Sequence, residues 1–250
     1  SLSYYRNSWF GVFTGTVLST AVLTGALVVG DSVRFSLGEL SKTRLGKTHF
    51  SVQPGDRFFR QQLADELAHQ TKSTVTAALQ LDGIAVNTDK SKQLNRVTVL
   101  GIDKQFSKLW DAPALYPGSD EAIISRNTAQ RLDLKPGDDI LLKIRKPSKA
   151  SSNAPFVSEK EPLTSFRLKV TSIADDLQMG RFSLLTNQSA PYNIFVNHAV
   201  LARKAGLPGN ANLLLVADPE TGTLSGQMLD SMVRECWQPE DAGLHIGLLT

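Results

Sequence analysis

The sequence predicts an α+β protein in which a long N-terminal transmembrane and stalk helix precedes a mixed α/β domain. Two observations indicate this organisation. Residues Trp9 to Gly30 include no charged side chain in 22 positions. From His49 onward, short segments in which apolar and polar residues alternate are interspersed with segments of helical period. This is the pattern of a domain that contains both sheets and helices.

The uncharged run has the length of a membrane span. Its 22 residues would cover about 33 Å as a helix, close to the roughly 30 Å of a bilayer's hydrocarbon core. We therefore predict a transmembrane helix over 9–30, with 1–8 as its cytoplasmic flank. Two alternatives stay open: a signal peptide, whose apolar core is shorter, at about 7 to 15 residues, and a soluble helix buried on every side.

One face of this helix is made of small residues. Gly11 and Gly15 form a G-x-x-x-G pattern, which Ser19 continues four residues later. Small side chains at this spacing let another helix approach closely. We expect Gly11, Gly15 and Ser19 to pack the helix against neighbouring membrane helices.

The helical period continues beyond the apolar run. Its apolar positions recur at spacings of four, four and three, at Val29, Val33, Leu37 and Leu40. Gly46 is suited to a left-handed C-cap that would end the helix. We predict a stalk helix over 31–46, whose four apolar residues pack against a second stalk helix.

The remainder, 47–250, is predicted to be an extracytoplasmic domain. It should contain a strand over 48–53, a helix over 58–70, and β-rich segments over 75–88 and 95–103. Ser, Lys and Pro dominate 146–163, which predicts a mobile loop between the two strands of a hairpin, 138–146 and 165–175.

An internal similarity recurs at an offset of 72 residues. The segment 123–144 aligns without gaps on 195–216, with Pro-Gly at the same place in both. Ser125 and Asn197 are good N-caps at equivalent positions. Each copy is predicted to be a strand, a helix of about ten residues and a second strand, so the domain should contain β-α-β units.

Composition argues against several kinds of site. The 27 basic and 24 acidic residues are spread along the chain, so no nucleic-acid partner is predicted. A single cysteine, Cys236, excludes an intrachain disulfide, and the four histidines lack metal-ligand spacing. We predict no metal, cofactor or catalytic residues.

Two motifs that suggest catalysis or nucleotide binding are incomplete. Ser41 to Thr48 ends like a phosphate loop, but its first glycine is missing and a helix precedes it. Gly30-Asp31-Ser32 matches the nucleophile block of Gly-Asp-Ser hydrolases, but a 22-residue run is too long for the strand that should precede it, and the partner blocks are incomplete. A serine hydrolase therefore remains only a third, remote alternative.

In order along the chain, several segments together resemble the FtsX/MacB-like permease family of ABC transporters. They are "TAVLTGALVVGDSVRFSL", "EAIISRNTAQRLDLKPGDDILL", "GRFSL", "PYNIFVNHAVL" and "ANLLLVA". The resemblance implies a permease subunit with at least four membrane helices. It also implies a periplasmic core domain of porter-like β-α-β units with a small inserted β-rich subdomain. On this interpretation the chain is a fragment, incomplete at its C-terminus.

The resemblance also implies partners and a location. ATP would be bound by a separate cytoplasmic ABC ATPase subunit, whose hydrolysis moves the ectodomain through the stalk. The other partners that the resemblance implies are a second permease protomer, the lipid bilayer and a periplasmic partner or substrate. The protein would lie in the cytoplasmic (inner) membrane with its ectodomain in the periplasm or outside. Charge alone leaves the orientation open, because long domains cross largely regardless of it.

One further alternative comes from a different class. A single-span, membrane-anchored binding or adaptor domain would show the same helix and the same kind of ectodomain, but would have no transport role. Nothing in the residues identifies a substrate.

Overall fold

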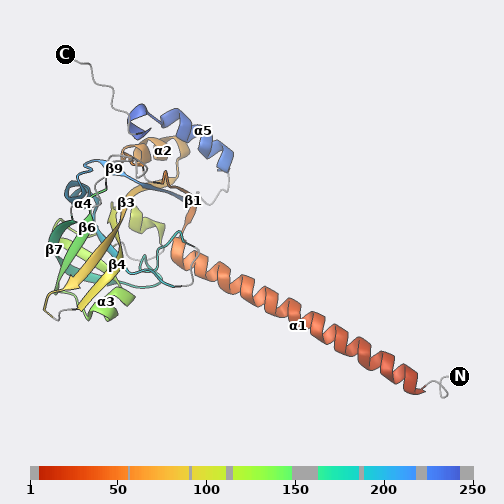
Figure 1. Cartoon of the computed structure of the whole chain (residues 1–250). Helices are drawn as coiled ribbons and strands as arrows, with labels where there is room; N and C mark the ends of the chain where they lie inside the picture. The colour runs from red at the N-terminus through yellow and green to blue at the C-terminus, as the bar shows by residue number, and fades with distance from the viewer. Residues whose placement is uncertain are drawn as a thin grey trace, which may run out of the picture. The chain divides into compact units, whose positions relative to one another are not determined.

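A computed structural model gives the fold of the chain (Figure 1). It describes residues 6–55, 57–89, 92–110, 115–147, 163–185, 189–217 and 224–242. Most of the predicted loop 146–163 lies outside these ranges. The chain divides into two compact units, Ser1–Lys42 and Thr43–Thr250, which are described separately below.

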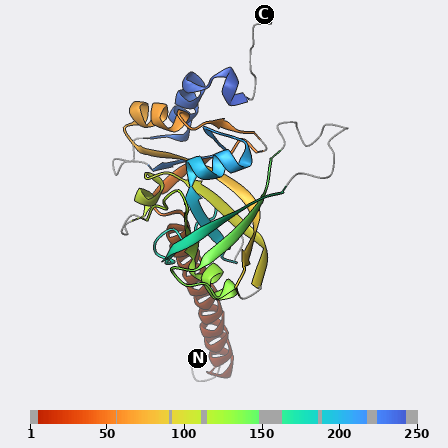
Figure 2. The same ribbon diagram turned by 90° about the vertical axis from the view of Figure 1, so that its left-hand side faces the viewer.

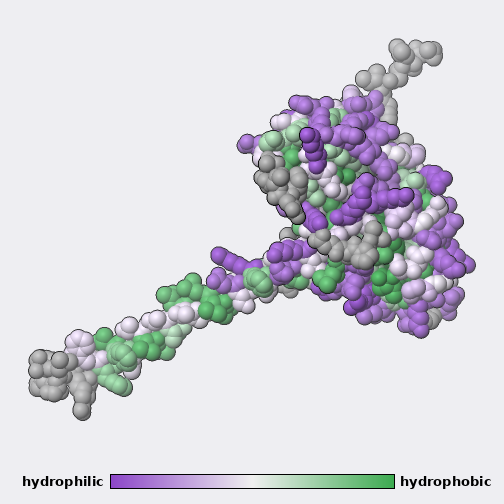
Figure 3. Space-filling model, turned by 180° about the vertical axis from the view of Figure 1, so that it is seen from behind, coloured by the Kyte–Doolittle hydropathy of each residue, from purple (hydrophilic) through white to green (hydrophobic). Residues whose placement is uncertain are grey.

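The helix α1 (Arg6–Leu45) accounts for all the described residues of the first unit. Its side chains from Trp9 to Lys42 are exposed, and Figure 3 shows that apolar ones cover much of its length. Within the apolar part, the hydroxyls of Thr16 and Thr20 donate to carbonyl oxygens four residues earlier. Among the described residues, this is the one helix long and apolar enough to cross a membrane.

The helix ends where the sequence predicts. Leu45 is its last residue, and Gly46 follows with φ = 56°, in the left-handed region that glycine adopts without a steric penalty. The run of helical period across Gly30-Asp31-Ser32 is therefore confirmed.

The second unit contains the described strands. They are β1 (Thr48–Val52), β2 (Phe59–Arg60), β3 (Thr74–Asn87), β4 (Lys92–Ile102), β5 (Glu121–Ser125), β6 (Asp139–Arg145), β7 (Leu163–Ala174), β8 (Asn193–Asn197), β9 (Asn210–Ala211) and β10 (Leu213–Ala217). The helices are α2 (Leu63–Thr71), η1 (Phe106–Leu109), α3 (Arg126–Leu132), α4 (His198–Ala205), α5 (Gly226–Cys236) and η2 (Pro239–Ala242).

Six strands close into a barrel. The large sheet runs β1-β10-β3-β4-β8-β5-β7-β6, and a further pairing of β3 with β6, Gly83 opposite Ile144, closes the six strands from β3 to β6 into a ring. Gly83 lies where β3 meets both neighbours, and a Cβ there would lie 3.0 Å from Val99 Cγ2 and 3.1 Å from the Lys143 carbonyl oxygen. Glycine at this position allows the barrel to close.

Apolar side chains from all six barrel strands fill the interior, together with residues of α3 and α4. The first part of β3 extends beyond the barrel and pairs with β10, which pairs with β1. One face of this extension carries a cluster with Phe106, Trp110 and Phe182, and the other carries a cluster under α2 and α5. Figure 2 shows α2 and α5 together at one end of the unit and the barrel strands at the other.

The predicted β-α-β units match in element order but not in strand adjacency. β5, α3 and β6 follow one another, and β8 and α4 lead through the short β9 to β10. In the sheet, however, β7 lies between β5 and β6, and β3 and β4 lie between β8 and β10. The helices have 7 and 8 residues rather than ten. Strand neighbours depend on pairings distant in sequence, which a local pattern does not encode.

Two further expectations can be compared with the fold. The hairpin is confirmed, because β6 and β7 pair antiparallel with Asp139 opposite Lys169. The small inserted β-rich subdomain stays a prediction. The strand β3 serves both the barrel and its extension, which makes 43–250 one compact unit.

Candidate functional site

The predicted packing residues lie along α1. Gly11, Gly15 and Ser19 are exposed, and no atom lies within 4 Å of a Cβ placed on either glycine. Val29, Val33, Leu37 and Leu40 are exposed as well. At 100° per residue, position 29 lies five full turns beyond position 11, so the two predicted sets share one helix face. The roles assigned to these seven residues stay predictions.

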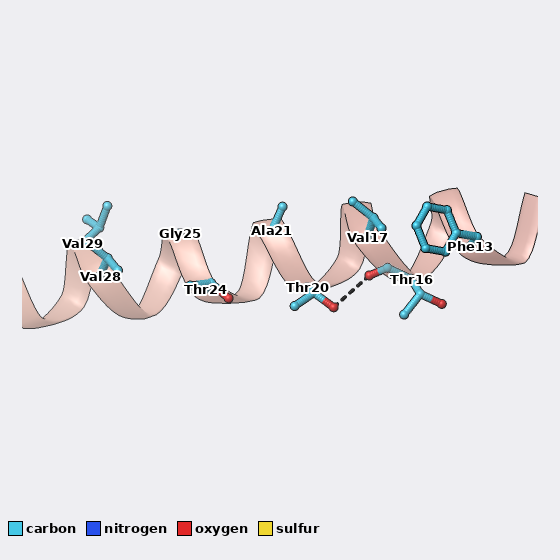
Figure 4. A pocket seen from close by; sticks show the side chains of 9 residues that line it. All are labelled: Phe13, Thr16, Val17, Thr20, Ala21, Thr24, Gly25, Val28 and Val29. Carbon is cyan, nitrogen blue, oxygen red and sulfur yellow. Dashed lines mark hydrogen bonds between the residues drawn. The ribbon is translucent and has the colours of Figure 1, made fainter. Parts of the chain in front are cut away.

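A shallow groove runs along α1, largely on the other side from Gly15 and Val33, and includes Val29 at the edge of the predicted packing face (Figure 4). Figure 4 shows its residues on successive turns of the one helix, which alone forms the groove: Phe13, Thr16, Val17, Thr20, Ala21, Thr24, Gly25, Val28 and Val29. The Thr20 hydroxyl donates to the Thr16 carbonyl at 2.8 Å, so its polarity is directed at the backbone. This surface suits lipid chains or another helix rather than a polar ligand.

The segment Thr43–Lys47, which we call the root, begins the second unit and is held by the chain around η1. Lys47 N donates to the Leu109 carbonyl oxygen at 2.7 Å. Gly46 packs so closely that a Cβ would collide with that same oxygen and lie 3.1 Å from Trp110 Cε2. Gly46 is therefore required both for its positive φ and for this contact.

Trp110 is the main side chain of this contact. It is 6% exposed, and its Nε1 donates to the Thr43 carbonyl at 3.3 Å. Its ring lies 5.4 Å from the Phe106 ring and 5.9 Å, edge to face, from the Phe182 ring. A second contact comes from Arg44, whose Nη1 donates to the Leu185 carbonyl at 3.4 Å. The root is thus bound to two segments of the domain.

The position of η1 is set by the end of β4. Asp103, the residue after β4, accepts hydrogen bonds at one oxygen from Gln105 N and Phe106 N, both at 2.9 Å, and from the Thr76 hydroxyl at 2.7 Å. Phe106 is fully buried, and its ring lies 6.1 Å from that of Phe195 in β8. Packed groups therefore connect the root to two strands of the barrel.

One buried titratable side chain lies close to this connection. His198, the first residue of α4, is 3% exposed, and its Nε2 has no hydrogen-bond partner among the described residues. Burial lowers the pKa of His198, against opposing effects of the Asp103 carboxylate and a hydrogen bond to the Asn210 backbone. The neutral imidazole is therefore the favoured form in the folded domain.

Ser125 and Asn197 both occupy N-cap positions, but they act differently. Asn197 Oδ1 accepts from the backbone of Ala199 and Val200, as expected of a capping side chain. The Ser125 hydroxyl makes no capping bond and interacts with the side chains of Asn127 and Thr128 instead. The prediction of a capping side chain at Ser125 was wrong, because these two neighbouring side chains engage its hydroxyl.

Enzymatic chemistry finds little support in the described part of the chain. Ser32 lies within α1, so the strand that a Gly-Asp-Ser hydrolase needs before its nucleophile is not formed. Among the described residues, no group of three His, Cys, Asp or Glu side chains could hold a metal ion.

The root contact was missed in the sequence. The short segment 104–111 contains three large apolar residues at spacings of three and one: Phe106, Leu109 and Trp110. This apolar content is the only sign in the sequence that the segment is buried. Nothing in that segment indicates that its partner lies some 60 residues earlier, at Thr43 and Gly46.

No family model and no curated protein matches the sequence. Solved structures that are similar to it include two domains of ABC transporters. The periplasmic region of MacB from Actinobacillus actinomycetemcomitans aligns with 11% identity and a TM-score of 0.46, covering 76% of each chain. The extracellular domain of the noncanonic ABC-type transporter YknZ from Gram-positive bacteria aligns with 12% identity and a TM-score of 0.45, covering 78% of this chain and 94% of that one.

Proposed function

We propose that the chain is part of an ABC transporter permease subunit of the FtsX/MacB-like type. Its 9–30 segment would cross the cytoplasmic membrane, 31–46 would form the stalk, and 47–250 would form the ectodomain on the far side. A separate cytoplasmic ATPase would bind ATP, and a second protomer would complete a dimer. The order of the resembling segments and the exposed apolar helix support this proposal.

The observation that carries the mechanism is the fixation of the root. Thr43, Gly46 and Lys47 are bound to η1 and Trp110 by two hydrogen bonds and a close backbone contact. A segment held in this way passes a displacement on to its partners, because packed interiors have low compressibility. Movement of the stalk would thereby reach β4 and β8 and shift the barrel.

The first test is the composition of the complete system. The full open reading frame should encode at least three further apolar spans, and its product should copurify with a Walker-type ATPase. A product with a single span and no ATPase would contradict the permease and favour the membrane-anchored adaptor.

The second test addresses the coupling. In the reconstituted complex, hydrogen exchange at 43–47 and 106–110 should differ between the ATP-trapped and ADP-bound states. Trp110→Ala should retain ATP hydrolysis and lose the nucleotide-dependent change in the barrel strands. Trp110→Phe keeps an aromatic ring against Phe106 and Phe182 and removes the indole hydrogen bond to Thr43. This variant should retain most of the nucleotide-dependent change in the barrel strands. Equal responses in wild type and Trp110→Ala would exclude this route.

A further inference from the structure

The last described segment of the domain, α5 with η2 (226–242), is attached differently from the rest. We call it the flap. It pairs with no strand, and α5 has one fully packed side chain, Leu229, among its 11 residues. Met232, Val233 and Trp237 are only partly buried against the same cluster. Apolar packing alone therefore holds this helix weakly by comparison with the barrel strands.

The far end of the flap is held by a buried ion pair. Asp241 has a fully buried side chain, whose oxygens accept from Arg60 N at 2.8 Å, Arg60 Nε at 3.1 Å and Arg60 Nη2 at 3.1 Å. Gln238 N donates to the same carboxylate at 2.9 Å. Arg60 also contacts Glu66 at 3.1 Å and donates to the Cys236 carbonyl at 3.3 Å. We call this arrangement the latch.

The latch is a strong local constraint. Its hydrogen bonds raise the pKa of the Arg60 guanidinium, with Asp241 as the largest cause, so the guanidinium stays ionised. Removal of the cationic partner of a buried carboxylate strongly destabilises a folded protein, because the remaining charge is buried without compensation. Opening of the flap into water, by contrast, would let both charges be hydrated.

The surface beneath the flap is apolar. Phe59, Leu63 and Leu67 belong to the cluster that the flap covers, and each is at most 1% exposed. The Phe59 ring lies 6.4 Å from that of Trp237, the residue after α5. This surface is continuous with β2 and α2, which remain in place if the flap moves.

We infer that α5 with η2 is a flap that opens as one unit without unfolding of the barrel, that the Arg60–Asp241 latch keeps it closed, and that opening uncovers the apolar surface of Phe59, Leu63 and Leu67. Arg60 lies only 13 residues beyond the end of the root. If the proposed function holds, movement of the root acts on the same segment that carries the latch. The flap itself does not depend on that function.

The primary experiment is native-state hydrogen exchange on the full wild-type chain in detergent micelles. Amides of 226–236 should exchange at lower urea concentration than those of β3 and β4, and with a smaller dependence on urea, because a local opening exposes less surface than global unfolding. Identical rates and identical urea dependence in both regions would overturn the inference. This measurement needs neither ATP nor a partner, so its outcome is separate from that of the transport proposal.

A variant pair tests the latch. Asp241→Asn should raise exchange in 226–236 at least about tenfold, since it removes the buried charge partner of Arg60 and leaves only the more exposed Glu66, while exchange in β3 and β4 stays as in wild type. Asp230→Asn is the matched control, because it removes an exposed ion pair to Arg234 on the same helix and should change little. Unchanged exchange in Asp241→Asn, or an equal rise in β3 and β4, would exclude a separate latch-held flap.

Cys236 provides an independent readout. It is the one cysteine in the sequence and lies half-buried at the end of α5, where burial raises the pKa of its thiol. Labelling by a maleimide should be faster in Asp241→Asn than in Asp230→Asn. Equal labelling rates would count against opening of the flap.

Discussion

The helix α1 exposes its apolar side chains, whereas the barrel buries them. Between Trp9 and Leu40 the large apolar side chains of α1 are exposed, from 41% at Leu40 to 72% at Phe35. The six barrel strands direct theirs into one interior, where most are fully buried. A domain that buries its own apolar side chains needs no partner for that burial, whereas an uncovered apolar helix requires lipid or other helices to cover it. Among the described residues, the long uncovered apolar surface therefore lies on α1, whereas the second unit contains its own buried cores.

The largest expected effect concerns the side chain that joins the root to the rigid body. Trp110→Ala should reduce the free energy of unfolding of the second unit by about 3–5 kcal/mol, because it removes a buried ring and leaves a cavity. Trp110→Phe should cost distinctly less. Hydrogen exchange of β3 and β4 amides measures both. A loss below about 1 kcal/mol, the size of an ordinary substitution, would show that the root is only loosely held.

Gly46→Ala should be the next most damaging. A left-handed backbone costs a non-glycine residue about 1–2 kcal/mol, and overpacking against Leu109 adds about 1–3 kcal/mol. Gly206→Ala is the matched control, since Gly206 also has positive φ, 77°, but no atom lies within 4 Å of a Cβ placed on it. Urea denaturation of both variants isolates the contribution of the contact. Equal losses would mean that Gly46 is needed for its backbone conformation alone.

A smaller effect should follow from acidification. Burial lowers the pKa of His198, so the unfolded chain binds its proton first as pH falls. The contribution of His198 to the free energy of unfolding is then constant above about pH 6.5. Below that pH the free energy of unfolding decreases by up to about 1.4 kcal/mol per pH unit, until the pKa of the folded state is reached. His198→Gln should remove this part of the slope. Denaturation midpoints of both proteins from pH 7.5 to 5 measure it, and parallel curves would contradict it.

The smallest effect on folding should come from α1. Gly15→Leu should leave the stability of the second unit within about 0.5 kcal/mol of wild type, as is usual for an exposed position. It should nevertheless weaken association of α1 with other membrane helices, because close approach is blocked. Thr24→Leu, in the groove and half a turn around the helix from Gly15, is the control. Energy transfer between labelled chains in vesicles tests this, and equal association in both variants would remove the packing role of Gly15.

Sequence reasoning succeeded where the signal is local. The charge-free run, the apolar period through Val29 and Val33, and the left-handed stop at Gly46 lie within a few turns of one another, and the hairpin of β6 and β7 joins strands consecutive along the chain. It failed where partners are distant. Gly83 meets Ile144 in β6, and Trp110 meets Thr43, without any pattern that relates one to the other.

Local patterns in the sequence suffice to predict that a long apolar helix leads into an α+β domain, because helix length, apolar period and strand alternation depend on side chains close together along the chain. The closure of six strands into a barrel, the root contact of Trp110 with Gly46, and the hold of Arg60 on Asp241 became visible only in the folded domain. Each of these depends on register, close packing or burial of charge between segments far apart in sequence, which are settled when the whole domain folds.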